Sequence, residues 1–400
     1  MLSKNYKVLF SLRLLKSILT NFVDVFLVLY FVNVSNNNIL TLGIYKLVAV
    51  ITIWLVIFIF KNYCKSKNRS YLMKIGILMY FIYFLFIILL REQVTSYIYV
   101  LGFLYGLEEG FYYSVYNMIE SDGIENKERE KYLGSSNAFK NIVAIIFPLF
   151  FGSLIQNSGF IKSIIVVLII VILEIILSMI LKDENIPKEN KIDLKNFNKE
   201  MKKYPQFKSI IKSYFCSGLT YSEGALSYVV TIYIIKVFSE SISLGIFTSI
   251  FSCISIIIGF LFIKIIKPKH YVKLLTITLP ITVVFLCIML LNCNFITVVL
   301  YNLFQTISKL LSDLISERNI ANFSNIDVIK NKYKVEYFFS LETSLFIGRV
   351  ISNSLFILML FLDANFIMLV FVIFVVSQAI SVIKLQLDMN KNSKLVKEGE

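Results

Sequence analysis

The side chains that could do chemistry in this chain are carboxylates placed inside long apolar stretches. Glu108 and Glu109 are adjacent in YGLEEGFYYSVYN. Asp24 follows Asn21 by three residues in LLKSILTNFVDVFLVLY, which puts both on one face of a helix. Glu223 lies at a comparable depth in SGLTYSEGALSYVV. A carboxylate in hydrocarbon is costly unless it binds a proton or a positive group. We therefore expect these residues to bind protons or a cationic ligand, with structural ion pairing as the alternative.

The surroundings of Glu108 and Glu109 favour the same interpretation. Adjacent residues on a helix point about 100° apart, so we expect only one of the two to face a given cavity. Gly106 and Gly110 flank the pair and would let a neighbouring helix approach closely. Aromatic rings that could hold a cationic or amphipathic ligand follow directly, although they could equally serve packing: Tyr112, Tyr113 and Tyr116.

Other charged residues in apolar stretches are interpreted as ion pairs or gates. Lys309 and Asp313 are four residues apart, and Glu342 and Arg349 are seven apart, so each pair shares one helix face. We interpret both pairs as structural, with a gating role as the alternative. Lys140 could pair with a carboxylate of the Glu108 helix or extend its amine toward the membrane surface.

The sequence lacks the residues that several kinds of catalytic, metal-binding and nucleotide-binding site require. The chain has a single histidine, His270, and its five cysteines form no CxxC pair. It also lacks the GxxxxGK[ST] pattern of a phosphate-binding loop. We therefore expect no catalytic residues, no metal site and no cofactor, and these residues argue against a membrane enzyme that acts on lipids.

The elements that must position these side chains are membrane helices. Of 400 residues, 57% are hydrophobic and only 16% are charged, against about 45–50% and about 25% in soluble domains. In hydrocarbon, helices satisfy every backbone polar group internally. We predict an all-α integral membrane protein with twelve transmembrane helices, at 14–34, 39–60, 72–90, 94–119, 133–157, 160–181, 208–238, 242–266, 271–291, 295–316, 335–361 and 365–385.

The basic residues give an orientation. They gather in alternate loops, around 61–69, 127–131, 182–212, 264–273 and 318–334, and in the tail. Since basic loops stay on the cytoplasmic side, we predict a multi-pass protein of the cytoplasmic membrane with both termini inside. This placement explains the net charge of +14 without nucleic-acid binding. The first apolar stretch is too long for a signal peptide and contains Asp24, so we expect it to be retained.

Loop lengths and a weak repeat divide the chain. The charged stretch 182–207 contains two prolines and lies at the midpoint. A shift of about 203 residues also aligns KNYCKSKNRSYL with KIIKPKHYVKLL. We predict an N-terminal six-helix bundle (1–181), a cytoplasmic linker (182–207), a C-terminal six-helix bundle (208–385) and a cytoplasmic tail (386–400), with the two bundles related by pseudo-symmetry.

This organisation resembles the major facilitator superfamily. The second and eighth helices are each followed by a basic loop, in FIFKNYCKSKNRSYL and in GFLFIKIIKPKHYVKLL. In the superfamily such a loop combines a glycine with clustered basic residues, and the second of these two loops has Gly259. The resemblance implies a secondary active transporter that works by alternating access. It also implies that the first, fourth, seventh and tenth helices line a central cavity.

The charge balance then suggests a solute. The four candidate carboxylates Asp24, Glu108, Glu109 and Glu223 outnumber the three basic candidates Lys140, Lys309 and Arg349, and 15% of the chain is aromatic. We expect a monomer that exports a cationic or amphipathic small molecule, such as a drug or peptide, coupled to protons. The alternatives are a non-transporting receptor or immunity protein on the same scaffold, or a lipid flippase.

Overall fold

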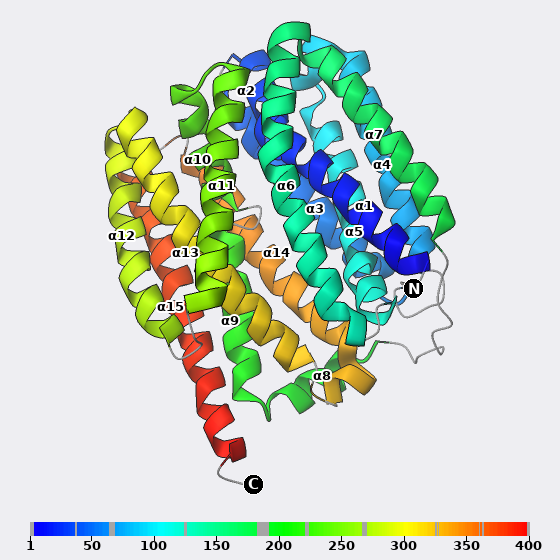
Figure 1. Cartoon of the computed structure of the whole chain (residues 1–400), viewed down its shortest axis with the longest axis vertical. Helices are drawn as coiled ribbons and strands as arrows, with labels where there is room; N and C mark the ends of the chain where they lie inside the picture. The colour runs from blue at the N-terminus through cyan, green and yellow to red at the C-terminus, as the bar shows by residue number, and fades with distance from the viewer. Residues whose placement is uncertain are drawn as a thin grey trace. The chain divides into compact units, whose positions relative to one another are not determined.

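The computed structural model of the chain is built from helices (Figure 1). It describes residues 4–36, 38–63, 69–123, 126–181, 192–220, 224–265, 270–324, 326, 328–359, 361 and 364–397. Every regular element among these residues is helical, so the predicted all-α class is confirmed.

The N-terminal elements begin with one long helix that contains a π-helical turn. Its parts are α1 (Lys4–Asn21), η1 (Phe22–Leu27) and α2 (Val28–Val34). The elements that follow are α3 (Ile39–Phe60), α4 (Arg69–Leu90), the 3₁₀ turn η3 (Arg91–Thr95), α5 (Ile98–Gly123), α6 (Asn126–Ser158) and α7 (Phe160–Ile180).

The remaining elements begin with a short helix, α8. They are α8 (Leu194–Met201), α9 (Pro205–Thr220), α10 (Ala225–Val237), α11 (Ser241–Ile265), α12 (Tyr271–Leu291), α13 (Phe295–Ser324), the π turn η5 (Ile329–Tyr333), α14 (Lys334–Met359) and α15 (Ala364–Lys397).

Ten helices among the described residues are long and apolar enough to cross a bilayer. The two other predicted spans are also helical. The fourth is α5, in which the glutamate pair and the tyrosines lower the hydropathy. The seventh is divided between α9 and α10, of 16 and 13 residues, each too short to cross alone.

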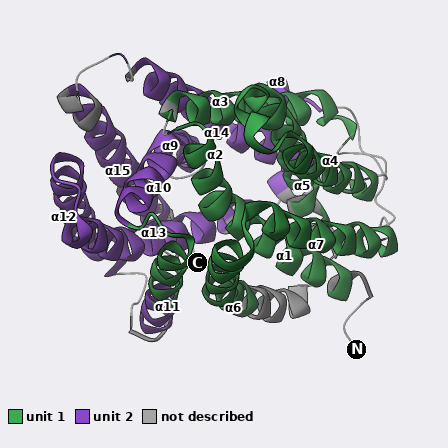
Figure 2. Ribbon diagram, turned by 90° about the horizontal axis from the view of Figure 1, so that it is seen from above, with its two compact units in different colours: residues 1–191, 238–253 green, residues 192–237, 254–400 purple. Residues whose placement is uncertain are grey.

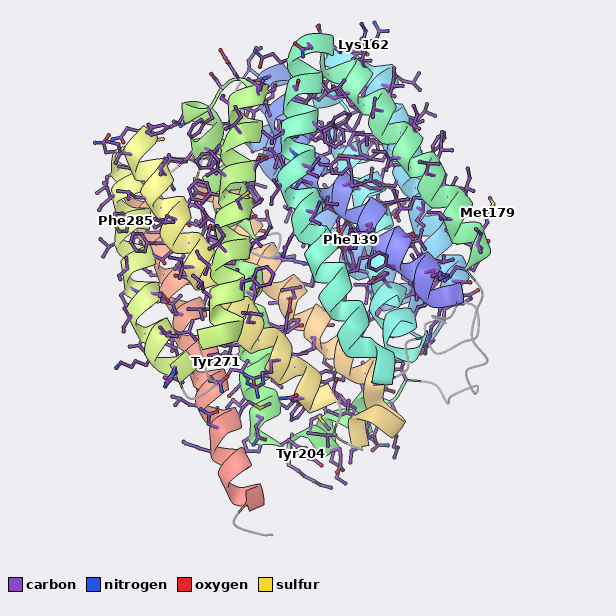
Figure 3. The ribbon with its side chains drawn as sticks, in the orientation of Figure 1. Phe139, Lys162, Met179, Tyr204, Tyr271 and Phe285 are labelled. Atoms are coloured by element: carbon purple, nitrogen blue, oxygen red, sulfur yellow. The ribbon has the colours of Figure 1, made fainter. Side chains whose placement is uncertain are left out.

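The exposed side chains suit a lipid environment. One face of α7 exposes Ile165, Ile169, Leu173, Ile176 and Met179. The opposite face buries Ser163, Ile164, Val167, Val171, Glu174 and Ser178. Figure 3 labels Lys162 near the start of α7 and Met179 near its end. A soluble protein rarely exposes such a continuous apolar strip, whereas a bilayer accommodates it.

The chain forms two compact units (Figure 2). Unit 1 comprises Met1–Lys191 and Phe238–Cys253, and unit 2 comprises Ile192–Val237 and Ile254–Glu400. The predicted domain limits, with a linker at 182–207, stay a prediction.

Part of the stretch expected to be a linker is a packed helix of unit 2. Helix α8 buries Phe197 completely and Met201 almost completely in an aromatic cluster. At its start, the backbone N–H of Asp193 donates to Glu336 Oε1 at 3.0 Å. The Asp193 carboxylate caps the helix by accepting the Asn196 N–H at 3.0 Å, and this hydrogen bond lowers the pKa of Asp193.

Candidate functional site

Close helix packing in unit 1 positions the Glu108 helix. A Cβ added to Gly106 would come within 2.6 Å of the Ala49 carbonyl oxygen on α3, and Gly102 and Gly110 make similar approaches one turn to either side. Gly76 brings α4 against the backbone of α5 at Glu108. The expected role of Gly106 and Gly110 is confirmed, and α5 is held between α3 and α4 with its carboxylates turned into unit 1.

The centre of the site is Lys16 of α1. Its ammonium donates to Glu108 Oε1 in a short hydrogen bond and to Glu109 Oε1 at 2.8 Å. The side chains of Lys16, Glu108 and Glu109 are 5%, 1% and 13% exposed. Both carboxylates therefore act on one group, and our expectation that adjacent residues would face different surroundings is wrong. A lysine side chain is long enough to place its ammonium between two carboxylates that diverge.

A third carboxylate, Glu174 of α7, completes the charge cluster. It is fully buried, and neither of its oxygens has a hydrogen-bond partner within the described part of the chain. Lys16 and Glu109 lie within electrostatic range of it. We therefore define the charge cluster as Lys16, Glu108, Glu109 and Glu174, which together place one ammonium among three carboxyl groups.

Tyrosine rings enclose the ammonium. Lys16 Nζ lies 4.4 Å from the centroid of the Tyr80 ring, 5.0 Å from that of Tyr112 and 5.7 Å from that of Tyr113. Ring faces attract a cation and exclude water, so they strengthen the buried ion pairs. Tyr116 stacks on Tyr112 at 5.3 Å between centroids. Tyr112 and Tyr116 are buried, whereas Tyr113 is 40% exposed.

The first membrane helix changes its winding beside the cluster. The π turn η1 begins at Phe22 and contains Asp24, so Asn21 and Asp24 are not related by the α-helical spacing that we assumed. Asn21 Oδ1 is buried without a hydrogen-bond partner among the described atoms, whereas the Asp24 side chain is exposed. Asp24 acts electrostatically on Tyr113. Single π turns within α-helices occur frequently at functional sites.

Unit 2 contains the interrupted seventh span. The hydroxyl of Ser352 on α14 donates to the Leu219 carbonyl at 2.8 Å and accepts the Ala225 N–H at 2.9 Å, so one side chain bonds both sides of the interruption. The sequence-predicted Glu223 lies between α9 and α10, outside the described residues.

The remaining predicted residues are not members of the charge cluster. Lys140 is exposed on α6, and the ammonium that Glu108 and Glu109 bind is that of Lys16. Lys309 and Asp313 are both exposed on α13. Glu342 and Arg349 are partly buried on α14, with Arg349 in electrostatic range of Glu342. Their structural or gating roles stay predictions.

Comparison with known proteins identifies the fold. The sequence model of the Major Facilitator Superfamily matches residues 9–318, more than half of the chain. The chain belongs to the Major Facilitator Superfamily. As a member of this superfamily it is a multi-pass membrane protein and a secondary transporter of a small solute, not an enzyme, as the sequence analysis predicted.

Two relatives of this superfamily member add detail. A crystal structure of a bacterial homologue of the iron transporter ferroportin, in an inward-facing state, matches with a TM-score of 0.65 at 12% identity. That match covers 96% of this chain and 99% of the other, and it concerns the fold. The uncharacterized protein YqgE of Bacillus subtilis (strain 168) is 22% identical over 345 residues, which cover 82% of this chain and 77% of the relative.

Proposed function

We propose that this transporter couples the export of a cationic or amphipathic solute to proton entry through the charge cluster of unit 1. The observation that supports this most is the pairing of one buried ammonium, on Lys16, with the carboxylates of both Glu108 and Glu109. Proton binding to either carboxylate would weaken that pairing. A change of protonation would therefore change the contacts that hold α1 against α5.

The charge of the cluster favours bound protons. With every group ionised, one ammonium and three carboxylates sum to −2. Buried charges without partners are strongly disfavoured, so a cluster with an excess of carboxylates retains protons. Those protons can be exchanged when the transporter opens to one side of the membrane and then the other by alternating access.

The solute is proposed to bind Asp24 and Tyr113 rather than Glu108. Lys16 already supplies the positive partner of Glu108, and it offsets part of the acidic excess expected from the sequence. Asp24 and Tyr113 are the predicted residues beside the cluster that remain exposed. A carboxylate next to an aromatic ring binds cationic and amphipathic molecules. We further propose a monomer in the cytoplasmic membrane with both termini in the cytoplasm.

The test is a proton flux measurement in inverted membrane vesicles. An inside-acid pH gradient would be followed with a fluorescent probe while cationic drugs, peptides, amino acids, sugars and a divalent metal are added singly. We expect one class of compound to dissipate the gradient with the wild type and with Glu92→Gln, a control in the exposed turn η3. We expect no dissipation with Glu109→Gln or Asp24→Asn.

Two results would change the proposal. Undiminished proton flux in both Glu109→Gln and Asp24→Asn would contradict the assignment of these residues. Binding of a compound without proton flux or uptake would favour the receptor alternative, and movement of a labelled lipid would favour the flippase.

A further inference from the structure

Helix α7 carries a buried carboxylate, Glu174, in addition to its extensive apolar face. Contact with lipid explains the apolar face but gives Glu174 no role. The exposed side of α7 carries isoleucine, leucine and methionine, and Glu174 is on the other side with Ser163 and Ser178. Its side chain is fully buried in unit 1. Since a carboxylate is costly to insert into hydrocarbon, such a residue is a candidate functional site.

The hydrogen bonding of Glu174 differs from that of Glu108 and Glu109. Those two carboxylates each accept a hydrogen bond from Lys16, whereas both oxygens of Glu174 are buried without a partner among the described residues. An ionised carboxylate in that position would lose its hydration and gain no donor in return. A neutral carboxylic acid carries no such penalty, so the geometry favours the protonated form.

The charged and titratable groups around Glu174 come from three helices. Lys16 faces it from α1, and Glu108, Glu109 and Tyr112 face it from α5. On α4, Lys74 binds the Leu181 carbonyl at the end of α7, and Tyr80 contacts Lys16. In the described side chains of α6, from 139 to 158, the one charged group is the exposed Lys140. The ammonium that acts on Glu174, that of Lys16, is thus already bound to two carboxylates.

Burial increases stepwise across the acidic residues of the site. Asp24 is exposed, the Glu109 side chain is 13% exposed, the Glu108 side chain is 1% exposed and Glu174 is fully buried. The hydroxyl of Tyr112 is also buried without a hydrogen-bond partner among the described atoms, and it interacts electrostatically with both Glu108 and Glu174. A hydroxyl can accept one proton and donate another, so Tyr112 can connect the two acids once a side-chain rotation brings it within hydrogen-bond distance of them.

We propose that Glu174 is an internal proton-binding site of this transporter, filled from Glu109 and Glu108 and separate from the solute-binding residues. In the filling step, the O–H bond of protonated Glu108 breaks and an O–H bond forms on Glu174, while Lys16 keeps its proton and the charge of the cluster is unchanged; release is the reverse. The coupling role rests on the proposed function, since it assumes that these protons drive solute movement. The proton occupancy of Glu174 is independent of the proposed function.

Infrared difference spectroscopy of the full-length protein in lipid nanodiscs tests the occupancy. At neutral pH we expect a C=O stretching band of a protonated carboxylic acid that shifts in deuterated water. The band should be absent from Glu174→Gln and unchanged in Glu92→Gln. Because glutamine resembles the neutral acid, Glu174→Gln should also keep the thermal unfolding midpoint of the wild type. Identical bands in both variants, or unfolding of Glu174→Gln, would overturn the proposal.

A transport readout separates coupling from structure. Exchange of labelled for unlabelled solute needs no net proton movement, and we expect Glu174→Gln to retain it. Accumulation of solute driven by a pH gradient should fall at least tenfold. Unchanged accumulation would overturn the coupling role. Absence of accumulation by the wild type would contradict the proposed function, and the infrared band would still decide whether Glu174 holds a proton.

Discussion

Lys16 is the residue on which the charge cluster depends. Its ammonium donates a hydrogen bond to one oxygen of Glu108 and one of Glu109 in a buried, ring-lined environment. Removing one partner of a buried ion pair costs more than removing both, because the remaining charge keeps its desolvation penalty. The cluster is therefore sensitive to the single loss of its cation.

Replacement of Lys16 by methionine tests this dependence. We expect Lys16→Met to lower the free energy of unfolding by about 3–5 kcal/mol at neutral pH, since Glu108 loses its cation. Thermal unfolding in detergent would measure the loss. Lys162→Met, at the exposed start of α7, serves as a control and should have little effect. Restored stability in Lys16→Met/Glu108→Gln would support the pairing, and equal midpoints for both single variants would contradict it.

The carboxylates of the site could be predicted from the sequence, but their partner could not. Glu108 and Glu109 are conspicuous because charge is rare in apolar stretches. Lys16 lies 92 residues before Glu108, near the basic end of its helix, where lysines commonly extend toward the membrane surface. The inward position of Glu174 is predictable, because Ser163, Glu174 and Ser178 share a face of a helix whose other face is apolar beyond Lys162.

At the scale of elements, glycines on α5 determine how closely α3 approaches. We expect Gly106→Ala to destabilise the protein by about 1–3 kcal/mol, because the new Cβ would overlap the Ala49 carbonyl oxygen and the Thr52 side chain. Gly259→Ala on α11 is the matched control. Its Cβ would meet only Leu310 at 3.8 Å, and alanine favours a helix by about 1 kcal/mol. Chemical or thermal unfolding that ranks the two variants the other way round would contradict this packing.

Helix α8 should respond to acid through its N-terminal residue. The pKa of Asp193 is lowered in the folded protein because its carboxylate accepts the Asn196 N–H. The stabilisation is therefore present above the unfolded pKa of about 3.9 and is lost as the pH falls through the lower, folded value. We expect faster amide hydrogen exchange over 194–201 near pH 3 than at pH 7, after correction for intrinsic rates.

A conservative variant isolates the charge of Asp193. Asparagine caps helices about as well as aspartate, so Asp193→Asn should keep α8 folded at pH 7 and lose the acid-dependent change. The same pH dependence in the variant would show that a group other than the Asp193 carboxylate is responsible.

The helices could be predicted from hydropathy because each span must bury about 20 apolar residues. The irregular segments of these helices could not be predicted from hydropathy. The interruption between α9 and α10 is stabilised by Ser352, which is 127 residues beyond Ala225 in the sequence. The π turn at Phe22–Leu27 has no local signal either, since its apolar residues suit an α-helix equally well.

At the scale of the whole molecule, the arrangement of basic loops predicts one orientation. In a variant with Cys64 as its single cysteine, we expect an impermeant maleimide to label the protein in inverted vesicles and not in intact cells. In a cysteine-free background, Asn157→Cys, at the exposed end of α6, should show the opposite labelling. Labelling of both sites from one side would contradict the predicted topology.

The separation of Lys16 from Glu108 has a consequence for biosynthesis. At about 5–20 residues per second, the ribosome needs roughly 5–18 s to add the 92 residues between them. During that interval the first helix carries a lysine whose carboxylate partners have not been made. We therefore expect Lys16 to extend toward the membrane surface in the newly inserted first helix and to reach Glu108 and Glu109 only after α5 has been made, in a late rearrangement of unit 1.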